Sequence, residues 1–128
     1  MSGAGQALAE AALALLRTVD GLNGAYDGAP LTAAFPYATV ESGQESDWSH
    51  KSGEGRELRL SILVRDKGES PAGLRALTAA VEAKASMIGP ELAGWRLVNL
   101  VFLRSVMLRG RDAAWTAAIE YRARLLKA

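Results

Sequence analysis

The clearest constraint on the fold is a stretch of strict alternation near the middle of the chain. Every second position is apolar there, at Leu58, Leu60, Ile62 and Val64. Charged or hydroxyl side chains fill most of the positions between them. A period of two is typical of a β-strand with one buried face. The pattern therefore predicts a strand over Arg56–Arg65 and requires a second layer of structure to cover its apolar face.

The last part of the chain predicts a pair of strands joined by a turn. Residues Trp95–Leu108 are mostly apolar on both faces of an extended chain, which predicts a long, largely covered strand with a bulge near Arg104. A turn signal follows at residues 110–112. Alternation then resumes over Trp115–Leu125, so the two segments are expected to form an antiparallel hairpin.

Two amphipathic segments predict helices. Between about Gly5 and Val19, apolar side chains recur at steps of three and four residues, at Leu8, Ala12, Leu15, Leu16 and Val19. In the second segment, Ser70-Pro71 supplies an N-cap oxygen followed by proline at the first helical position, and Gly89-Pro90 ends the helix. Its buried stripe is expected to consist of Leu74, Leu77, Val81, Ala85 and Ile88.

The region after the first helix is predicted to contain one short strand and one long loop. Pro36 disfavours helical geometry in the residue before it, and the side chains that follow predict a strand over Tyr37–Glu41. Ser, Gly and charged residues dominate Ser42–Gly55, which predicts a long loop that is functional or mobile. Ala25-Tyr26 is expected to be at most a short extended piece.

These elements predict an α+β fold with the order α-β-β-α-β-β. We expect a two-layer sandwich in which two helices lie on one face of an antiparallel sheet of about four strands. The 128 residues are expected to form a single domain, residues 1–128. A domain of this size buries about two thirds of the surface of its unfolded chain, so no disulfide or structural metal is needed to stabilise it.

Several classes of protein are excluded by simple features. The chain has no cysteine, which excludes a disulfide scaffold, a thiolate metal site and a Cys nucleophile, and which agrees with assembly in a reducing cytoplasm. No basic residue precedes the apolar stretch Ala7–Leu16, which also contains Glu10, so it does not resemble a signal peptide. No run approaches the ~20 apolar residues of a membrane span, and no membrane contact is expected.

No constellation of residues predicts catalysis, a metal or a cofactor. The single His50 has no second His or Cys beside it, whereas catalytic zinc normally takes three protein ligands. Asp47, Ser49 and His50 lie too close together in one segment to adopt the geometry of a catalytic triad. The Gly53-Glu54-Gly55 motif precedes a strand, and its carboxylate would repel phosphate. We therefore predict that the protein is not an enzyme.

Charge is distributed unevenly along the chain. Residues 1–95 hold 8 Lys and Arg against 12 Asp and Glu, whereas residues 96–128 hold 7 against 2. One interpretation is a basic strand face exposed to solvent. Another is that oppositely charged surfaces meet on neighbouring copies, in a heterologous contact that closes into a ring if the rotation permits. Nonspecific contact of the late basic residues with DNA also stays open, but aromatic residues for base stacking are not interleaved with them.

Four short motifs follow one another along the chain. They are Tyr26-Asp27-Gly28, Phe35-Pro36-Tyr37, the segment from Asp47-Trp48-Ser49 to Gly53-Glu54-Gly55-Arg56-Glu57, and Arg96-Leu97-Val98-Asn99-Leu100. Together and in this order they resemble the small tail-terminator, or tail-completion, proteins of long-tailed bacteriophages and of the gene transfer agents that descend from them. The resemblance covers roughly Leu8 to Leu125, and that family is built in the same general α+β way.

The resemblance implies a structural virion component. In that family several copies, usually six, close into a ring on the last ring of the tail tube, stop its polymerisation and present a surface to the head connector. The implied partners are other copies of the chain, the tail tube protein and the head-side stopper or connector. The implied location is the bacterial cytoplasm during assembly and then the neck of the particle. A head-side adaptor or stopper, and a small homo-oligomeric ligand-binding domain or enzyme, stay open as alternatives.

Six residues are candidate interface positions: Trp48, His50, Glu54, Arg56, Arg122 and Arg124. Trp48 is a large amphipathic side chain in a polar segment, as is common at interface anchors. The segment around it is expected to contact the ring or the tube. The two late arginines are expected to meet the acidic early part of a neighbouring copy.

Overall fold

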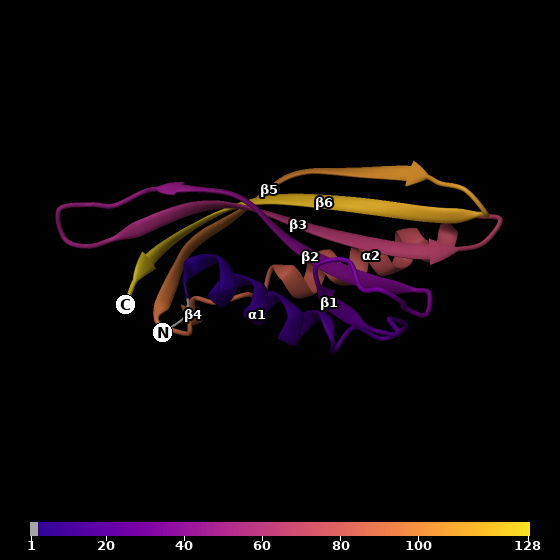
Figure 1. The fold of residues 1–128 in the computed structure, drawn as a ribbon, viewed down its shortest axis with the longest axis horizontal. Helices are drawn as coiled ribbons and strands as arrows, with labels where there is room; N and C mark the ends of the chain where they lie inside the picture. Colours follow the sequence, from indigo (N-terminus) through magenta and orange to yellow (C-terminus); the bar gives the residue numbers. More distant parts are fainter. Residues whose placement is uncertain (1–2) are drawn as a thin grey trace.

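The computed structural model describes residues 3–128, which form two helices and six strands (Figure 1). In chain order the elements are α1 (Ala4–Leu16), β1 (Ala25–Asp27), β2 (Tyr37–Asp47), β3 (Gly55–Lys67), α2 (Ala72–Ala85), β4 (Glu91–Leu92), β5 (Trp95–Arg109) and β6 (Ala114–Lys127). The strands form one sheet with the order β1-β2-β3-β6-β5-β4. The two strands with the clearest alternation, β3 and β6, therefore lie at its centre.

The predicted four-stranded antiparallel sandwich is wrong in strand number, strand direction and shape. Two additional short strands, β1 and β4, lie at the edges of the sheet, and β1 runs parallel to β2, which makes the sheet mixed. The sheet also curls into a half-barrel around the helices instead of forming a flat layer (Figure 1). Strands of three and two residues are too short to show alternation, and a period of two carries no information on curvature.

Three interruptions of register bend the long strands. They lie between Ser42 and Glu45 in β2, and between Leu97 and Asn99 and between Phe102 and Arg104 in β5. Bulges of this kind bend a strand and increase its local twist, so they help the sheet to curl. The last of the three confirms the bulge that was predicted near Arg104.

The core lies between the two helices and the concave side of the sheet. The central strands contribute fully buried side chains at Leu58, Leu60, Ile62, Val64, Ala117, Ile119 and Leu125. Helix α1 adds Leu8 and Leu16, and α2 adds Leu74 and Val81. Burial of each large aliphatic side chain contributes on the order of 1.5–3 kcal/mol. The predicted helices, the strand that begins near Arg56 and the C-terminal antiparallel hairpin are confirmed.

The predicted loop over Ser42–Gly55 is wrong, because β2 continues to Asp47. Every residue from Glu41 to Asp47 is exposed, so this half of the strand has no burial pattern from which it could be identified. Its pairing with β3 holds it in the sheet, up to Asp47 opposite Arg56. The segment Trp48–Glu54 connects β2 and β3, and we call it the hairpin tip.

Candidate assembly surfaces

Hydrogen bonds give the hairpin tip a defined shape. Trp48 N–H donates to the Gly55 carbonyl (2.9 Å), and His50 and Gly53 exchange two backbone hydrogen bonds of 2.8 and 3.1 Å. The Ser49 hydroxyl donates to Asp47 Oδ1 (2.6 Å) and accepts from Gly55 N–H (3.0 Å). The tip is thus a closed turn at the end of a hairpin that extends away from the body of the molecule (Figure 1).

Three of the predicted interface residues meet at the base of this tip. The Trp48 and His50 rings are in edge contact, with centroids 4.5 Å apart and planes at 75°. The Arg124 guanidinium lies 5.4 Å from the Trp48 ring centroid, within the range of a cation–π contact. Trp48 is half-buried and His50 exposed. The arginine of β6 therefore helps to orient the hairpin's aromatic side chain, and the imidazole remains accessible.

The two other predicted residues of the hairpin do not join this cluster. Glu54 exposes its carboxylate at the tip, and its backbone carbonyl accepts from Lys127 N–H (2.9 Å). Arg56 Nη1 lies 2.8 Å from Glu45 Oε2. Both side chains of this ion pair are partly exposed, so the pair contributes only about 0–1 kcal/mol. Its main effect is to link β2 to β3.

The outer face of the sheet, which points away from the helices, carries two cross-strand ion pairs. Glu57 lies opposite Arg124, and Arg104 lies opposite Glu120. The Arg124 Nε donates to Glu57 Oε1 at 2.8 Å, and Arg104 Nε pairs with Glu120 Oε2. The hydrogen bond from Arg124 holds the pKa of Glu57 below its ordinary value. Arg124 therefore has partners within its own chain, and it is not simply a solvated cation.

Arg122 lies between these two pairs and faces another arginine. Its cross-strand neighbour on β3 is Arg59, and like charges directly opposite each other are unfavourable. The Arg122 Nε atom is buried and has no hydrogen-bond acceptor among the described residues. This row of the outer face therefore carries positive charge that neither Glu57 nor Glu120 fully compensates, although the charges of Arg122 and Arg59 help to lower the pKa of Glu57.

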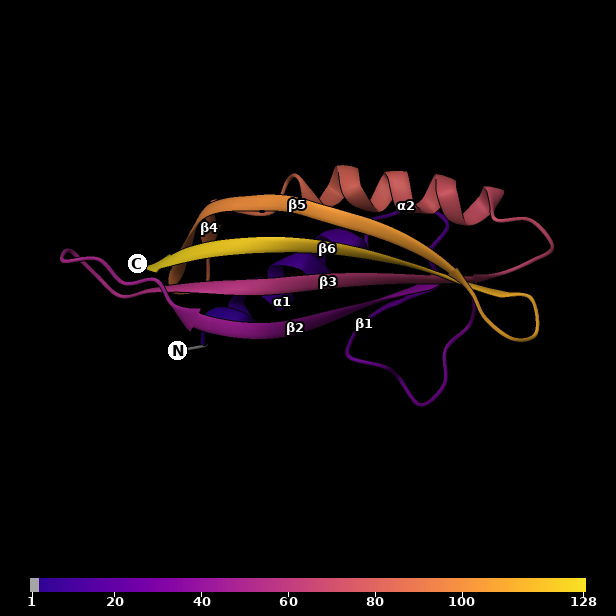
Figure 2. The ribbon, with the colours of Figure 1, turned by 90° about the horizontal axis from the view of Figure 1, so that it is seen from above.

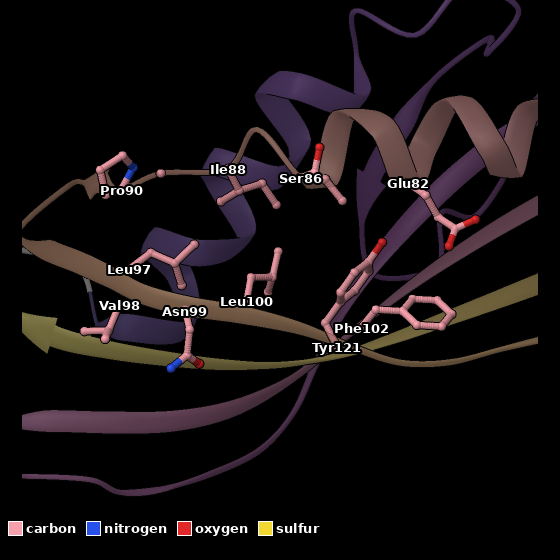
Figure 3. A pocket seen from close by; sticks show the side chains of 12 residues that line it. Glu82, Ser86, Ile88, Pro90, Leu97, Val98, Asn99, Leu100, Phe102 and Tyr121 are labelled. Carbon is pink, nitrogen blue, oxygen red and sulfur yellow. The ribbon is translucent and has the colours of Figure 1, made fainter.

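A groove of about 500 Å³ lies between the end of α2 and β5. Figure 3 shows Tyr121 pointing its hydroxyl toward α2, with Phe102 beside it and Glu82 above. The two aromatic rings are 6.0 Å apart at 78°. Burial raises the pKa of Tyr121 to about 12, and the Glu82 carboxylate adds to the rise, so the phenol stays neutral near pH 7. The lining is largely apolar, which suits packing rather than acid–base chemistry.

Strand β5 is much more exposed than its composition predicted. The predicted covered strand is wrong here, because Val98, Phe102, Leu103 and Leu108 keep 44%, 48%, 37% and 58% of their surface exposed. The groove described above separates the end of α2 from Val98 and Phe102, and neither Leu103 nor Leu108 lines it. The sequence did contain a relevant signal, because a strand that is apolar on both faces needs other residues to cover both faces. It gave no indication that this chain leaves the strand uncovered.

Neither a metal site nor a membrane helix is found in the described part of the chain. Among residues 3–128, no group of three or more His, Asp or Glu side chains is placed to hold a metal ion. None of the helices described over the same residues is long and apolar enough to cross a membrane.

Comparisons with known proteins agree with a role in assembly. A family model described as "Tail completion protein gp17" matches residues 4–126. A chain of a solved structure described as "Virion of native gene transfer agent (GTA) particle" is 28% identical, with a TM-score of 0.68. The similarity covers 98% of this chain and 99% of that chain. No curated protein matches this chain.

These comparisons show that the protein belongs to the class of structural virion proteins. Within that class, the chain belongs to the tail completion protein gp17 family. The resemblance drawn from the four sequence motifs is confirmed, and the family match extends slightly beyond the expected coverage of Leu8 to Leu125 at both ends. The protein is a structural component of a phage-like tail, and such a component assembles with other proteins of the particle.

Proposed function

We propose that the protein is a tail terminator. Several copies, six as is usual in this family, close into a ring on the last ring of the tail tube. The ring stops tube polymerisation and presents a surface to the head-side connector at the neck, after assembly in the bacterial cytoplasm. The observation that carries this proposal is the family match over residues 4–126, together with chain-long similarity to a gene transfer agent virion chain.

The hairpin tip is the best candidate for contact with the tube or with a neighbouring copy. It extends from the body at one end of the molecule (Figure 1), is closed by its own hydrogen bonds and contains Trp48, His50 and Glu54. A preordered projection loses little conformational entropy when it binds. The half-buried Trp48 ring, held by Arg124, offers an aromatic anchor of the kind that dominates interface energies.

The row formed by Arg59 and Arg122 is a candidate for weak contact with DNA that passes through the ring. These cations lie opposite each other on the outer face. Backbone phosphates would supply acceptors without reading sequence. Because phosphate contacts carry no sequence information, the contact would be independent of sequence and weakened by salt.

Localisation of the chain on separated heads and tails tests the proposal against a head-side adaptor. A small tag at the exposed C-terminal Ala128 is labelled with gold, and particles blocked in head–tail joining are imaged. We expect one label at the end of each free tail and none on free heads. Label on free heads alone would favour the head-side adaptor, and label along the tube would favour a tube subunit.

A further inference from the structure

The sheet leaves a stretch of backbone unpaired on each of its two sides. Strand β1 pairs with β2 only over Ala38–Val40, so within the described chain Glu41–Asp47 is paired only with β3. Strand β4 pairs with β5 only at Trp95 and Arg96, so Leu97–Arg109 has β6 as its only strand partner among residues 3–128. Free backbone donors and acceptors on such edges are templates for another strand.

These two unpaired stretches lie at the same level of the sheet. Across the four central strands, one row joins Asp47, Arg56, Leu125 and Leu97. Another row joins Glu41, Ser61, Glu120 and Arg104. The free β2 edge, Glu41–Asp47, therefore spans the same height as residues 97–104 of β5. Because Leu97 N–H donates to the Pro90 carbonyl (2.7 Å), the unpaired part is residues 98–104, which we call the free β5 edge. Figure 2 shows β2 and β5 on opposite sides of the sheet.

Strand direction also suits a contact between two copies in the same orientation. Each neighbouring pair in the series β2, β3, β6 and β5 is antiparallel, so β2 and β5 run in opposite directions. A second copy related by rotation about an axis along the strands would place its β2 antiparallel to β5 of the first copy. Antiparallel pairing is the more stable arrangement per residue, and no inversion of either copy is needed.

The two edges also differ in chemistry in a complementary way. The free β2 edge contains Glu41, Glu45 and Asp47, all exposed, and no cation. The free β5 edge contains one arginine, Arg104, and no acidic residue; Arg104 pairs with Glu120 but keeps 68% of its side-chain surface exposed. The free β5 edge also exposes Val98, Phe102 and Leu103, whereas edges that stay solvated are usually protected by proline or inward charges.

From these observations we infer that β5 of one copy pairs with the free β2 edge of the next copy, so that the sheet continues from protomer to protomer. The contact is heterologous: each copy contributes β2 to one neighbour and β5 to the other, and such contacts close into a ring. Acidic side chains of β2 lie beside Arg104 of β5, and the hairpin of the next copy covers the exposed apolar side chains. The inference rests on the self-association part of the proposed function and adds the surfaces that carry it.

Cysteine crosslinking tests this pairing without crosslinks from native thiols, because the chain has no cysteine. Ser46→Cys places a thiol on the free β2 edge, and Val98→Cys places one on the free β5 edge; both side chains are exposed. Particles that contain both variants in one chain are oxidised and run on a denaturing gel. We expect a ladder of covalent multiples that ends at the ring number, and each single variant alone should give monomer.

Other outcomes would contradict the inference in different ways. Dimers from Val98→Cys alone would show a symmetric β5–β5 contact instead. If the double variant stays monomeric in particles of normal appearance, the inference is wrong. The control is a second double variant, Ala14→Cys with Ala79→Cys, whose side chains are exposed on the two helices. A ladder of equal strength from this control would also overturn the inference. If the double variant fails to assemble, mixing the two purified single variants must give heterodimer; a mixture that stays monomeric contradicts the pairing. Crosslinks in purified protein would support the pairing even if tail termination proved wrong.

Discussion

Arg124 contacts two parts of the candidate site with one guanidinium group. It donates to Glu57 on β3 at 2.8 Å and lies 5.4 Å from the Trp48 ring centroid. Since the hydrogen bond lowers the pKa of Glu57 from an ordinary value of 4.5, the ionised carboxylate stabilises the folded chain above that pH. This contribution is lost as the pH falls from 4.5 through the lowered pKa, because over that range the unfolded state binds more protons than the folded state.

We predict that Arg124→Ala raises the pKa of Glu57 toward its ordinary value. The reason is loss of the hydrogen bond that makes the largest contribution to the shift. An NMR titration of the Glu57 carboxyl measures this change in pKa. Arg122→Ala is the matched control, because Arg122 acts on Glu57 only through charge, and its effect should be smaller. An unchanged titration of Glu57 in Arg124→Ala would show that the ion pair does not form in solution.

Gly55 provides a second prediction at the scale of residues. A Cβ atom at this position would lie 2.4 Å from the Trp48 carbonyl oxygen and 2.9 Å from Leu126 Cδ2, so the backbone of the hairpin would have to move. We expect Gly55→Ala to lower the free energy of unfolding by about 1–3 kcal/mol, measured by urea denaturation. Gly53→Ala in the same tip meets nothing within 4 Å and should change stability by about 0.5 kcal/mol or less. Equal effects would contradict the close approach.

At the scale of elements, β5 is the strand whose exposure has the strongest consequence. Leu103→Lys places a charge on the free β5 edge, which opposes strand addition. We expect the folded chain to keep its stability within about 0.5 kcal/mol. The fraction of heads with attached tails, counted by electron microscopy, should fall by roughly tenfold or more, as expected for loss of a central apolar contact.

The control for this change is Leu31→Lys, since Leu31 is fully exposed in the segment before β2. It introduces the same charge at a leucine outside the proposed contact. Normal head–tail joining with Leu103→Lys, or equal loss with Leu31→Lys, would show that the free β5 edge does not carry the assembly contact.

Elements that bury a regular pattern could be predicted from the sequence, and exposed elements could not. Burial of alternate residues from Leu58 to Val64 and of the α1 stripe leaves a periodic signal. The outer half of β2 is exposed throughout and is held by backbone pairing, which leaves no signal in side-chain type. β1 and β4 are too short for a period, so the strand number and the mixed sheet were not predictable.

The residues of the candidate site also divide into those that could be predicted from the sequence and those that could not. Trp48 and Arg124 could be selected because a tryptophan in a polar segment and a cluster of late arginines are unusual in composition. The bond between Arg124 and Glu57 joins residues 67 positions apart, so the three-dimensional fold was needed to find it. The free β5 edge was missed because an apolar strand gives the same pattern whether its cover comes from its own chain or from another copy.

At the scale of the whole molecule, the two free edges make each copy bivalent. Opposite charge on the β2 and β5 edges favours head-to-tail contact and disfavours pairing of like edges. The net charge of the chain is only +1, so the opposite charge of the two edges arises from how the charged residues are distributed along the sheet. The ordered hairpin tip extends beyond the sheet at one end (Figure 1), which leaves it available for a third partner in the tail or head.

The most direct test of the central claim is tail length in particles made without this protein. A host that lacks only this chain is compared, by negative-stain electron microscopy, with the same host complemented by it. If the protein terminates the tail, filled heads will be separated from tails, and tail lengths will be irregular or excessive; complementation will restore joined particles of uniform length. Tails of normal length attached to heads in its absence would contradict the claim.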